Sequence, residues 1–515
     1  MTARTPNGGD EPEREPKAEA RARSGRWPAR VLYAAVFALA AAWCARLSAE
    51  AASAVFGTDE CFHAWVAQWI AQHGRLPETI ESLYGGFAYF YQPLLHLVGA
   101  AGFALLGEAG LRFLPLAAAA GVLLAVAAGA RGAVPAAARA WTVLLLVASG
   151  LFATWAVRLY AESLSALVLT GGALALVVQQ RRGGRGWTIL LGVLAGLAIL
   201  AKWSGWALPA LLAIAAAVRA VHGEAAPARS LAAALGIGLL VAAPWLIRNQ
   251  VLFGSALYPL GATDVDPGLL ALHRTRFSIP PPAFFSGLPR LLGPIMVALA
   301  AMAALAVVIE RRWTVRESVW AFALAGIVAT AFMPVAAARH LVAFLPLLAL
   351  GSAWIVADAF GRRGTPAWPV SLALIAAATW TLVRAPDHRA GASPPPALME
   401  AFEAVARVTP EDATVLSLWT YDTFYHGRRA ATWPVPWGQS ASPAPLFTTK
   451  DPARFAAALD SLGIGYVLAP KSAPLEPWNG SNYPDTFVTC LRVLMESGRI
   501  QVAWQSDRFV LLRRE

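Results

Sequence analysis

The sequence predicts a polytopic α-helical membrane protein that carries a soluble α/β domain at its C-terminal end. Two features of the composition indicate the membrane class. Hydrophobic residues make up 57% of the chain and charged residues only 14%, with a mean hydropathy of +0.53. A soluble domain carries roughly a quarter charged residues, so lipid must cover most of this surface. A third feature, the return of ordinary polar sequence after Arg384, predicts the C-terminal domain.

The net charge of +11 does not indicate a nucleic-acid-binding protein. Most arginines form short clusters between apolar segments, which is the pattern of cytoplasmic loops in membrane proteins. We therefore expect membrane lipids, and no nucleic acid, among the partners of this chain.

The N-terminal region predicts a tail followed by a membrane anchor. Residues 1–29 are polar and rich in Pro, Glu and Arg, so they are expected to form a disordered cytoplasmic tail. Arginines then precede an apolar run over 31–56 that is long enough to cross a bilayer. This order predicts a retained signal-anchor helix with the N-terminus inside and Asp59 outside.

Eleven further apolar segments follow, and the first is short for a crossing. It covers 93–107, whereas a span needs about 20 residues. If 93–107 does not cross, the later arginine clusters fall on the cytoplasmic side; if it crosses, they all fall outside. We therefore predict about eleven spans in a transmembrane domain over 30–384, with external juxtamembrane helices over 57–107. The other segments are 110–130, 138–156, 160–179, 187–203, 205–221, 230–247, 291–309, 318–335, 340–359 and 367–383.

The C-terminal part is predicted to lie outside the membrane. Residues 385–396 form a proline-rich linker, and 397–515 are predicted to form an external α/β domain. A buried strand is expected at 413–419, a helix, turn and strand at 451–470, and a closing hairpin at 499–514. No catalytic constellation stands out here, so a lid or acceptor-docking role is the expectation.

The chain has no glycine-rich phosphate loop and no paired His or Cys spacing for zinc. Chemistry on the outer face also has little access to cytosolic nucleotides. The energy for a reaction there must arrive with the substrate, and a lipid-linked activated group is a natural carrier.

The first external loop contains the strongest catalytic candidates. Asp59 and Glu60 are adjacent carboxylates among aromatic residues, and a carboxylate in a partly dry pocket can act as a general base. The alternative is a solvated acid pair. His63 lies one helical turn further on; a structural histidine is favoured over one that orients an acid or binds a metal or phosphate.

A second group of candidates is basic. Lys202, Arg248, Arg339 and His340 each lie where a span reaches the outer interface, where positive residues are disfavoured. They are either snorkelling anchors or a binding site for a phosphate at membrane depth. Arg158 and Glu162, one turn apart, form a local pair or bring a second acid near Asp59.

These motifs resemble one family. TDECFHAW (58–65) resembles the first-external-loop acidic motif of the GT-C-fold glycosyltransferases, a class that includes protein O-mannosyltransferases and lipid A aminoarabinose transferases. Gln92-Pro93 departs from the double proline that is commoner in that family. The resemblance covers nearly the whole chain, and five further segments match in order: HGRLPETIESLYGGFAYFYQPLLHLVGA (73–100), RLYAES (158–163), AKWSG (201–205), PWLIRNQVLFGSALYP (244–259) and RHLVAFLPLLAL (339–350).

The resemblance implies a membrane enzyme with a GT-C fold. Such an enzyme takes a sugar from a polyprenyl-phosphate donor at the outer face of the cytoplasmic (inner) membrane and inverts its anomeric carbon. Asp59 would deprotonate a lipid, glycan or protein acceptor. Glu60, His63 and Glu162 would support the site, and a divalent metal ion at Asp59, Glu60 and His63 is left open as a cofactor. The donor phosphate would be bound by Lys202, Arg248, Arg339, His340 and Arg158.

Two other classes of function are weighed against this one. A transporter or flippase of lipid-linked sugars predicts charged residues at the bilayer midplane and inverted repeats, whereas the polar residues here gather at the outer ends. A non-catalytic membrane scaffold predicts no need for Asp59 or for the basic cluster.

Overall fold

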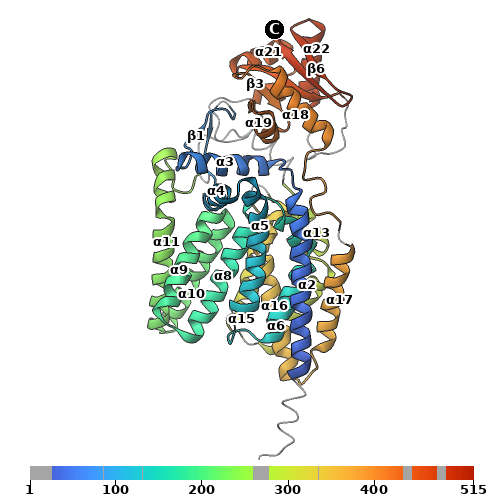
Figure 1. Cartoon of the computed structure of the whole chain (residues 1–515). Helices are drawn as coiled ribbons and strands as arrows, with labels where there is room; N and C mark the ends of the chain where they lie inside the picture. The colour runs from blue at the N-terminus through green and yellow to red at the C-terminus, as the bar shows by residue number, and fades with distance from the viewer. Residues whose placement is uncertain are drawn as a thin grey trace, which may run out of the picture.

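A computed structural model describes residues 26–84, 86–129, 131–258, 278–311, 313–333, 336–384, 386–432, 444–471 and 483–515. Most of the tail predicted over 1–29 lies outside these residues. The described chain forms a body of roughly parallel helices, and the C-terminal part sits on one end of that body (Figure 1).

Thirteen of the described helices make up the body. Several have few charged residues between their ends, and glycines such as Gly183 after α8 and Gly254 after α11 follow their last residues. The helices are α2 (Arg26–Ala52), α5 (Glu108–Leu124), α6 (Ala136–Val147), α7 (Gly150–Ala156), α8 (Ala161–Arg182), α9 (Arg185–Ala201), α10 (Ala207–Val221), α11 (Ala225–Phe253), α13 (Pro281–Leu292), α14 (Pro294–Glu310), α15 (Val315–Ala331), α16 (Leu345–Arg362) and α17 (Trp368–Arg384).

The body is that of a multi-pass membrane protein. Among the described residues, six helices are long and apolar enough to cross a membrane, or up to eight if each of two bent pairs is one span. The bent pairs are α6 with α7 (71°) and α13 with α14 (106°). Helices α9 and α17 are apolar but have only 17 residues each. The count of about eleven spans stays a prediction.

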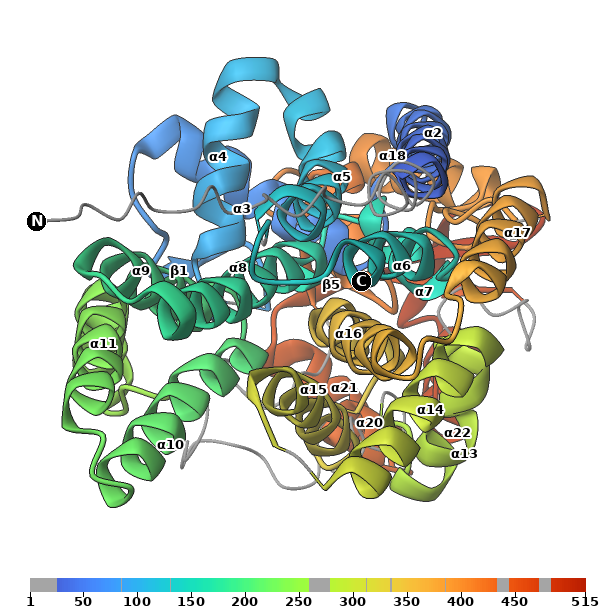
Figure 2. The same cartoon turned by 90° about the horizontal axis from the view of Figure 1, so that it is seen from below.

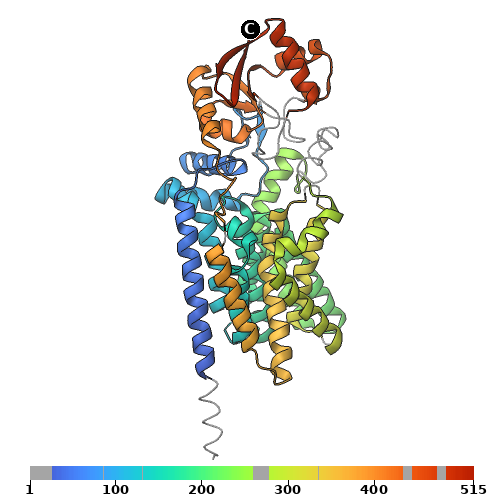
Figure 3. The same ribbon diagram turned by 90° about the vertical axis from the view of Figure 1, so that its right-hand side faces the viewer.

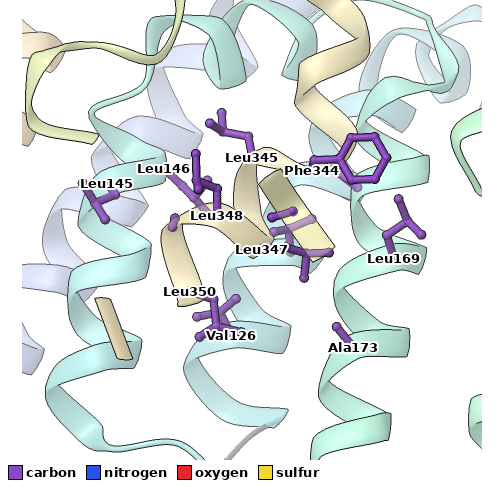
Figure 4. Packing of buried hydrophobic residues seen from close by; sticks show 14 of the residues in the cluster. Val126, Leu145, Leu146, Leu169, Ala173, Phe344, Leu345, Leu347, Leu348 and Leu350 are labelled. Atoms are coloured by element: carbon purple, nitrogen blue, oxygen red, sulfur yellow. The ribbon is translucent and has the colours of Figure 1, made fainter. Parts of the chain in front are cut away.

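The centre of the body is a dry apolar core around α16. Residues 345–356 of this helix are buried throughout. Figure 4 shows Leu345 to Leu350 between Leu145 and Leu146 of α6 on one side and Leu169 and Ala173 of α8 on the other. A helix that is apolar on all sides must lie inside such a bundle.

Two short helices lie across the end of the body, beneath the C-terminal part (Figures 1 and 3). They are α3 (Asp59–His73) and α4 (Leu94–Leu106), joined through the strands β1 (Thr79–Ile80) and β2 (Phe87–Ala88). Helix α4 has 13 residues, too few for a crossing, as expected for 93–107. It turns directly into α5, and a Cβ on Gly110 would lie 2.1 Å from the Gly102 carbonyl oxygen, so the turn requires glycine there.

The predicted cytoplasmic loops meet at the opposite end of the body. Arg182 at the end of α8 donates to the Arg131 carbonyl, 3.4 Å away, and Arg362 at the end of α16 pairs with Glu310 at the end of α14. The start of α2 lies at this same end in Figure 1. The segments that follow α5, α8, α14 and α16 therefore lie on one side of the body, as the sequence predicts for their arginines.

The C-terminal part forms a mixed five-stranded sheet in the order β4-β3-β5-β7-β6. The strand predicted at 413–419, the helix and strand at 451–470 and the antiparallel hairpin at 499–514 are all present. The elements are α18 (Pro396–Val408), β3 (Thr414–Ser417), α19 (Thr420–Gly427), β4 (Ala430–Thr432), α20 (Ala444–Thr448), α21 (Pro452–Ser461), β5 (Ile464–Pro470), α22 (Asp485–Glu496), β6 (Ile500–Gln505) and β7 (Phe509–Arg514).

Candidate active site

A cavity of about 1800 Å³ runs through the helical body and ends beneath the C-terminal part. Its walls along the body come mainly from α10 and α15, which face each other when the body is seen from the predicted cytoplasmic end (Figure 2). Most of their lining side chains, such as Leu211, Ile214 and Phe322, are apolar, and at the predicted cytoplasmic end the cavity also reaches Arg219 and Glu224. Its outer end is polar and is lined by Asp59, His63, Tyr160, Glu162, Lys202, Arg339 and His340.

Four charged side chains of alternating sign form a chain at this outer end. Arg339 Nη1 donates to Asp59 Oδ2 at 3.0 Å, and Arg339 Nε lies 3.6 Å from Glu162 Oε1. Glu162 then pairs with Lys202. They come from the starts of α3 and α8, the end of α9 and a 3-10 turn, Ala338–Ala343. The tertiary fold therefore joins residues up to 280 positions apart.

Two side-chain nitrogens of adjacent residues at this outer end are buried and have no hydrogen-bond partner among the described residues. They are Arg339 Nε, whose nearest carboxylate is Glu162 at 3.6 Å, and His340 Nδ1, which donates or accepts according to the tautomer. A buried polar group without a partner costs free energy, and such groups are rare unless a ligand or water completes them. Both residues line the cavity, so an anionic ligand there would complete the site.

Asp59 is the first residue of α3, and its side chain remains 39% exposed beside Arg339. It therefore has lone pairs that face the cavity as well as one that accepts from Arg339. An ionised carboxylate that keeps open lone pairs is suited to accept a proton from a bound substrate.

His63 lies at the cavity wall but is tied to a buried chain. Its Nδ1 lies 2.8 Å from His96 Nε2, and His96 Nδ1 lies 2.7 Å from the Tyr89 hydroxyl. Burial, and then the charges of Arg339 and Lys202, lower the pKa of His63 to about 3. The ring is therefore neutral and offers a hydrogen bond rather than a positive charge.

Glu60 points away from the cavity, although it follows Asp59 directly. Its carboxylate is 1% exposed, accepts two N–H groups of Arg389 at 2.9 Å, and accepts the Leu159 N–H at 2.8 Å. Arg389 is itself buried and comes from the segment 385–396 that was expected to be only a linker. Arg389 is not among the residues predicted for the site; the need of a buried Glu60 for a partner is the signal that points to it.

The structure does not bring Arg248 and Arg158 to the cavity. Arg248 donates to the carbonyls of Tyr89 (3.0 Å) and Pro77 (2.9 Å), and its guanidinium lies 4.9 Å from the Trp245 ring. Arg158 lies over Trp155, 5.2 Å from the ring centre. Neither residue lines the cavity, so of the five predicted phosphate-binding residues only Lys202, Arg339 and His340 are in place.

The predicted metal ligands do not converge. Each of the three predicted ligands has a different partner: Glu60 contacts Arg389, His63 Nδ1 contacts His96, and Asp59 contacts Arg339. Within the described ranges, no three His, Cys, Asp or Glu side chains form a group that could hold a metal ion. No step of the reaction is therefore assigned to a metal.

The C-terminal part supplies side chains to the cavity that the sequence did not indicate. Tyr421 and Asp422, at the start of α19, both line it. The Tyr421 ring packs 5.2 Å from Phe62 of α3 and 6.0 Å from Tyr84. The aromatic and acidic run 420–427 is a signal only once α19 is known to rest on α3.

The helical body, the two helices across its end and the sheet above them define a class of protein: a multi-pass membrane protein with the GT-C fold, the fold expected from the sequence. No family model and no curated protein sequence matches the chain. The fold is therefore established by structural similarity to solved proteins and not by sequence similarity.

One similar structure is ArnT from Cupriavidus metallidurans bound to undecaprenyl phosphate, with 16% identity and a TM-score of 0.61 over 94% of this chain and 97% of that one. Another is the oligosaccharyltransferase AglB from Archaeoglobus fulgidus in complex with an inhibitory peptide and a dolichol-phosphate, with 13% identity and a TM-score of 0.62 over 85% of this chain and 69% of that one. A third is the mycobacterial arabinofuranosyltransferase AftD, with 16% identity and a TM-score of 0.52 over 94% of this chain and 41% of that one.

Proposed function

We propose that this protein is an inverting glycosyltransferase that moves a sugar from a polyprenyl-phosphate donor to an acceptor on the outer face of the cytoplasmic membrane. One observation carries the proposal: a single cavity joins a polar end at Asp59, Arg339 and Lys202 to long apolar walls on α10 and α15. This shape suits a ligand with a charged head and a long hydrocarbon chain.

The donor phosphate is placed at the unpaired nitrogens of Arg339 and His340 and near the Lys202 ammonium. Its hydrocarbon chain lies between α10 and α15, where burial gains about 25 cal/mol per Å² of apolar surface. Two of the similar structures contain polyprenyl-phosphate carriers of this kind: ArnT is bound to undecaprenyl phosphate, and AglB is in complex with a dolichol-phosphate.

Asp59 then acts as the general base. It takes the proton of an acceptor hydroxyl or amine, and the freed lone pair attacks the anomeric carbon of the donor sugar. The bond from that carbon to the phosphate oxygen breaks, and the electron pair leaves with the phosphate. Arg339 and Lys202 stabilise the negative charge on the departing phosphate, which is where electrostatic catalysis has its largest effect.

The cavity does not suit a flippase of lipid-linked sugars. A sugar phosphate that crosses the layer would pass Leu211, Ile214 and Phe322, which offer no hydrogen bonds. Moving an ionised group through such surroundings is strongly unfavourable. A purely structural scaffold, in turn, has no use for the unpaired nitrogens at the outer end.

The test uses purified protein in lipid vesicles with a panel of undecaprenyl-phosphate sugars, and measures the release of undecaprenyl phosphate. Wild type should turn over at least one pentosyl or hexosyl donor, and the product should have the inverted anomeric configuration. Asp59→Asn should lose this turnover. Equal turnover by the two proteins would refute the role of Asp59.

The orientation has a separate test. Arg363 directly follows α16, whose last residue belongs to the predicted cytoplasmic end, and Ser497 directly follows α22 of the C-terminal part; both are exposed. A cysteine at position 363 should react with a membrane-impermeant maleimide only in inside-out vesicles, and a cysteine at 497 only in intact cells after outer-membrane permeabilisation. The reverse pattern would place the active site in the cytoplasm.

A further inference from the structure

Helix α19 of the C-terminal part holds the chain immediately before the catalytic candidate. Asp422 Oδ1 accepts the Thr58 N–H at 2.8 Å, and His426 Nε2–H donates to the Phe56 carbonyl at 2.8 Å. One turn of α19 therefore binds the backbone on both sides of Gly57. Further along, Gln68 of α3 donates to the Tyr425 hydroxyl at 2.9 Å.

Thr58 has a backbone conformation that threonine rarely adopts. Its φ is 56° and its ψ is −134°, and it is the residue that precedes α3. Positive φ is unfavourable for a β-branched residue and persists only where neighbouring groups impose it. The conformation matters because it sets the direction in which α3 begins.

Two side chains from distant segments impose this conformation. The Asp422 carboxylate, 2% exposed, binds the Thr58 N–H, and the Tyr160 hydroxyl lies 3.0 Å from the Thr58 hydroxyl. The Thr58 carbonyl then accepts the Cys61 N–H at 3.1 Å and so begins the first turn of α3. Asp59 is the first residue of that turn, so its position follows from that of Thr58.

We propose that Asp422 is a positioning residue: by holding Thr58 at positive φ, it places the Asp59 carboxylate against Arg339. The C-terminal part thereby completes the active site through one backbone hydrogen bond. This inference rests on the proposed function, in which Asp59 and Arg339 share the outer end of the donor site.

The consequence is measurable with undecaprenyl phosphate alone. Asp59 competes with the phosphate of the carrier for Arg339, so Asp59→Asn should lower the Kd for undecaprenyl phosphate by about twofold to fivefold, the usual range for a partly exposed ion pair. Asp422→Ala releases Thr58, the carboxylate withdraws from Arg339, and the Kd should fall by about threefold. A merely structural role would raise the Kd, because a loosened site binds less well.

Three variants identify the backbone as the route. Asp422→Asn keeps the oxygen that accepts from Thr58 and should bind like wild type. Thr58→Gly combined with Asp422→Ala should return to the wild-type Kd, because glycine adopts positive φ without strain. Thr58→Ser combined with Asp422→Ala, the matched control, should not. In thermal unfolding, Asp422→Ala should also lower the Tm less in the Thr58→Gly background than in wild type.

The two levels of the proposal fail separately. If Asp59→Asn leaves the Kd unchanged, Asp59 does not face the carrier phosphate and the proposed site is wrong. If Asp59→Asn tightens binding but Asp422→Ala does not, or if the glycine variant fails to restore it, the positioning role of Asp422 is wrong. If Asp422→Ala does not fold, the Tm comparison is made with Asp422→Ser, whose shorter side chain does not reach the Thr58 N–H, and an equal loss in both backgrounds also overturns the proposal.

Discussion

Asp59 and Glu60 are neighbours in the sequence with the same kind of side chain and opposite surroundings. Asp59 accepts one arginine N–H and faces the cavity with 39% of its side chain exposed. Glu60 is 1% exposed and accepts three donors, two of them from Arg389. A buried carboxylate bound by three donors is held in place by the protein, whereas one that accepts a single donor and faces a cavity can still contact a substrate. The number of hydrogen bonds that each carboxylate accepts from the protein, more than its charge, distinguishes the structural acid Glu60 from the reactive acid Asp59.

Helix geometry explains the division. Consecutive residues on a helix point about 100° apart, since each turn contains 3.6 residues. The side chain of Asp59 therefore reaches the cavity, while that of Glu60 is directed to Arg389.

The largest expected effect is the difference in turnover between variants of Asp59 and Glu60. Asp59→Asn should lower turnover of an accepted undecaprenyl-phosphate sugar by about 10²–10⁴-fold, the usual contribution of a general base. Glu60→Gln, measured per folded molecule, should retain most of its turnover. Initial rates in vesicles, with the folded fraction from gel filtration, provide the comparison. A similar loss in both variants would mean that the two carboxylates act together.

The second prediction concerns the buried pair. Arg389→Ala leaves Glu60 buried without its partner and should destabilise the protein by about 3–5 kcal/mol. The double variant Glu60→Met with Arg389→Met removes both charges and should be more stable than Arg389→Ala. Unfolding followed by circular dichroism measures both. If the single and double variants are equally stable, the pair is not desolvated as the structure indicates.

The third prediction compares two arginines that the sequence groups together. Arg339→Ala should weaken undecaprenyl phosphate binding by about tenfold to a hundredfold, because a hydrogen bond to a charged group is worth about 1.5–3 kcal/mol. Arg248→Ala should leave the Kd unchanged, since Arg248 is bound to the Tyr89 and Pro77 carbonyls. The Kd of each variant follows from the fluorescence of the cavity tryptophans. Weaker binding by both would return Arg248 to the phosphate site.

The smallest expected effect is a pH dependence at Asp422. Burial, and then the nearby Asp59 and Glu60 carboxylates, raise the pKa of Asp422 from 3.8 to about 7, although the Thr58 N–H opposes the shift. Between these two values the folded protein keeps a proton that the unfolded chain releases. Stability from this group therefore falls as pH rises from about 4 to about 7 and is constant above that.

Asp422→Asn isolates this contribution. The shift corresponds to about 2 kcal/mol between pH 5 and pH 7.5, so over this range the Tm of wild type should fall by roughly 2 °C more than that of Asp422→Asn in a chain of this length. The comparison between variants removes the contribution of His63 and other groups, which titrate equally in both. Parallel Tm curves would show that Asp422 is ionised in the folded protein throughout this range.

The site was only partly predictable from the sequence. Asp59, Glu162, Lys202 and Arg339 were expected near the outer face, and the structure joins them in one chain of ion pairs. Arg389 and Asp422 were not expected. Arg389 binds Glu60, and Asp422 binds the Thr58 N–H. Glu60 and the Thr58 N–H need such partners because they are buried, and their burial is known only from the tertiary structure.

Composition and hydrophobic length by themselves determined the membrane class, the succession of apolar helices, the short helix at 93–107 and the strands of the C-terminal part. Each depends on local periodicity and on the cost of exposing apolar surface to water, which a sequence expresses directly. Only the tertiary structure decided which arginine meets which carboxylate, which of two adjacent acids remains open, and that α19 supports Thr58. Those outcomes depend on contacts between residues hundreds of positions apart, and their energies arise from burial that no local pattern encodes.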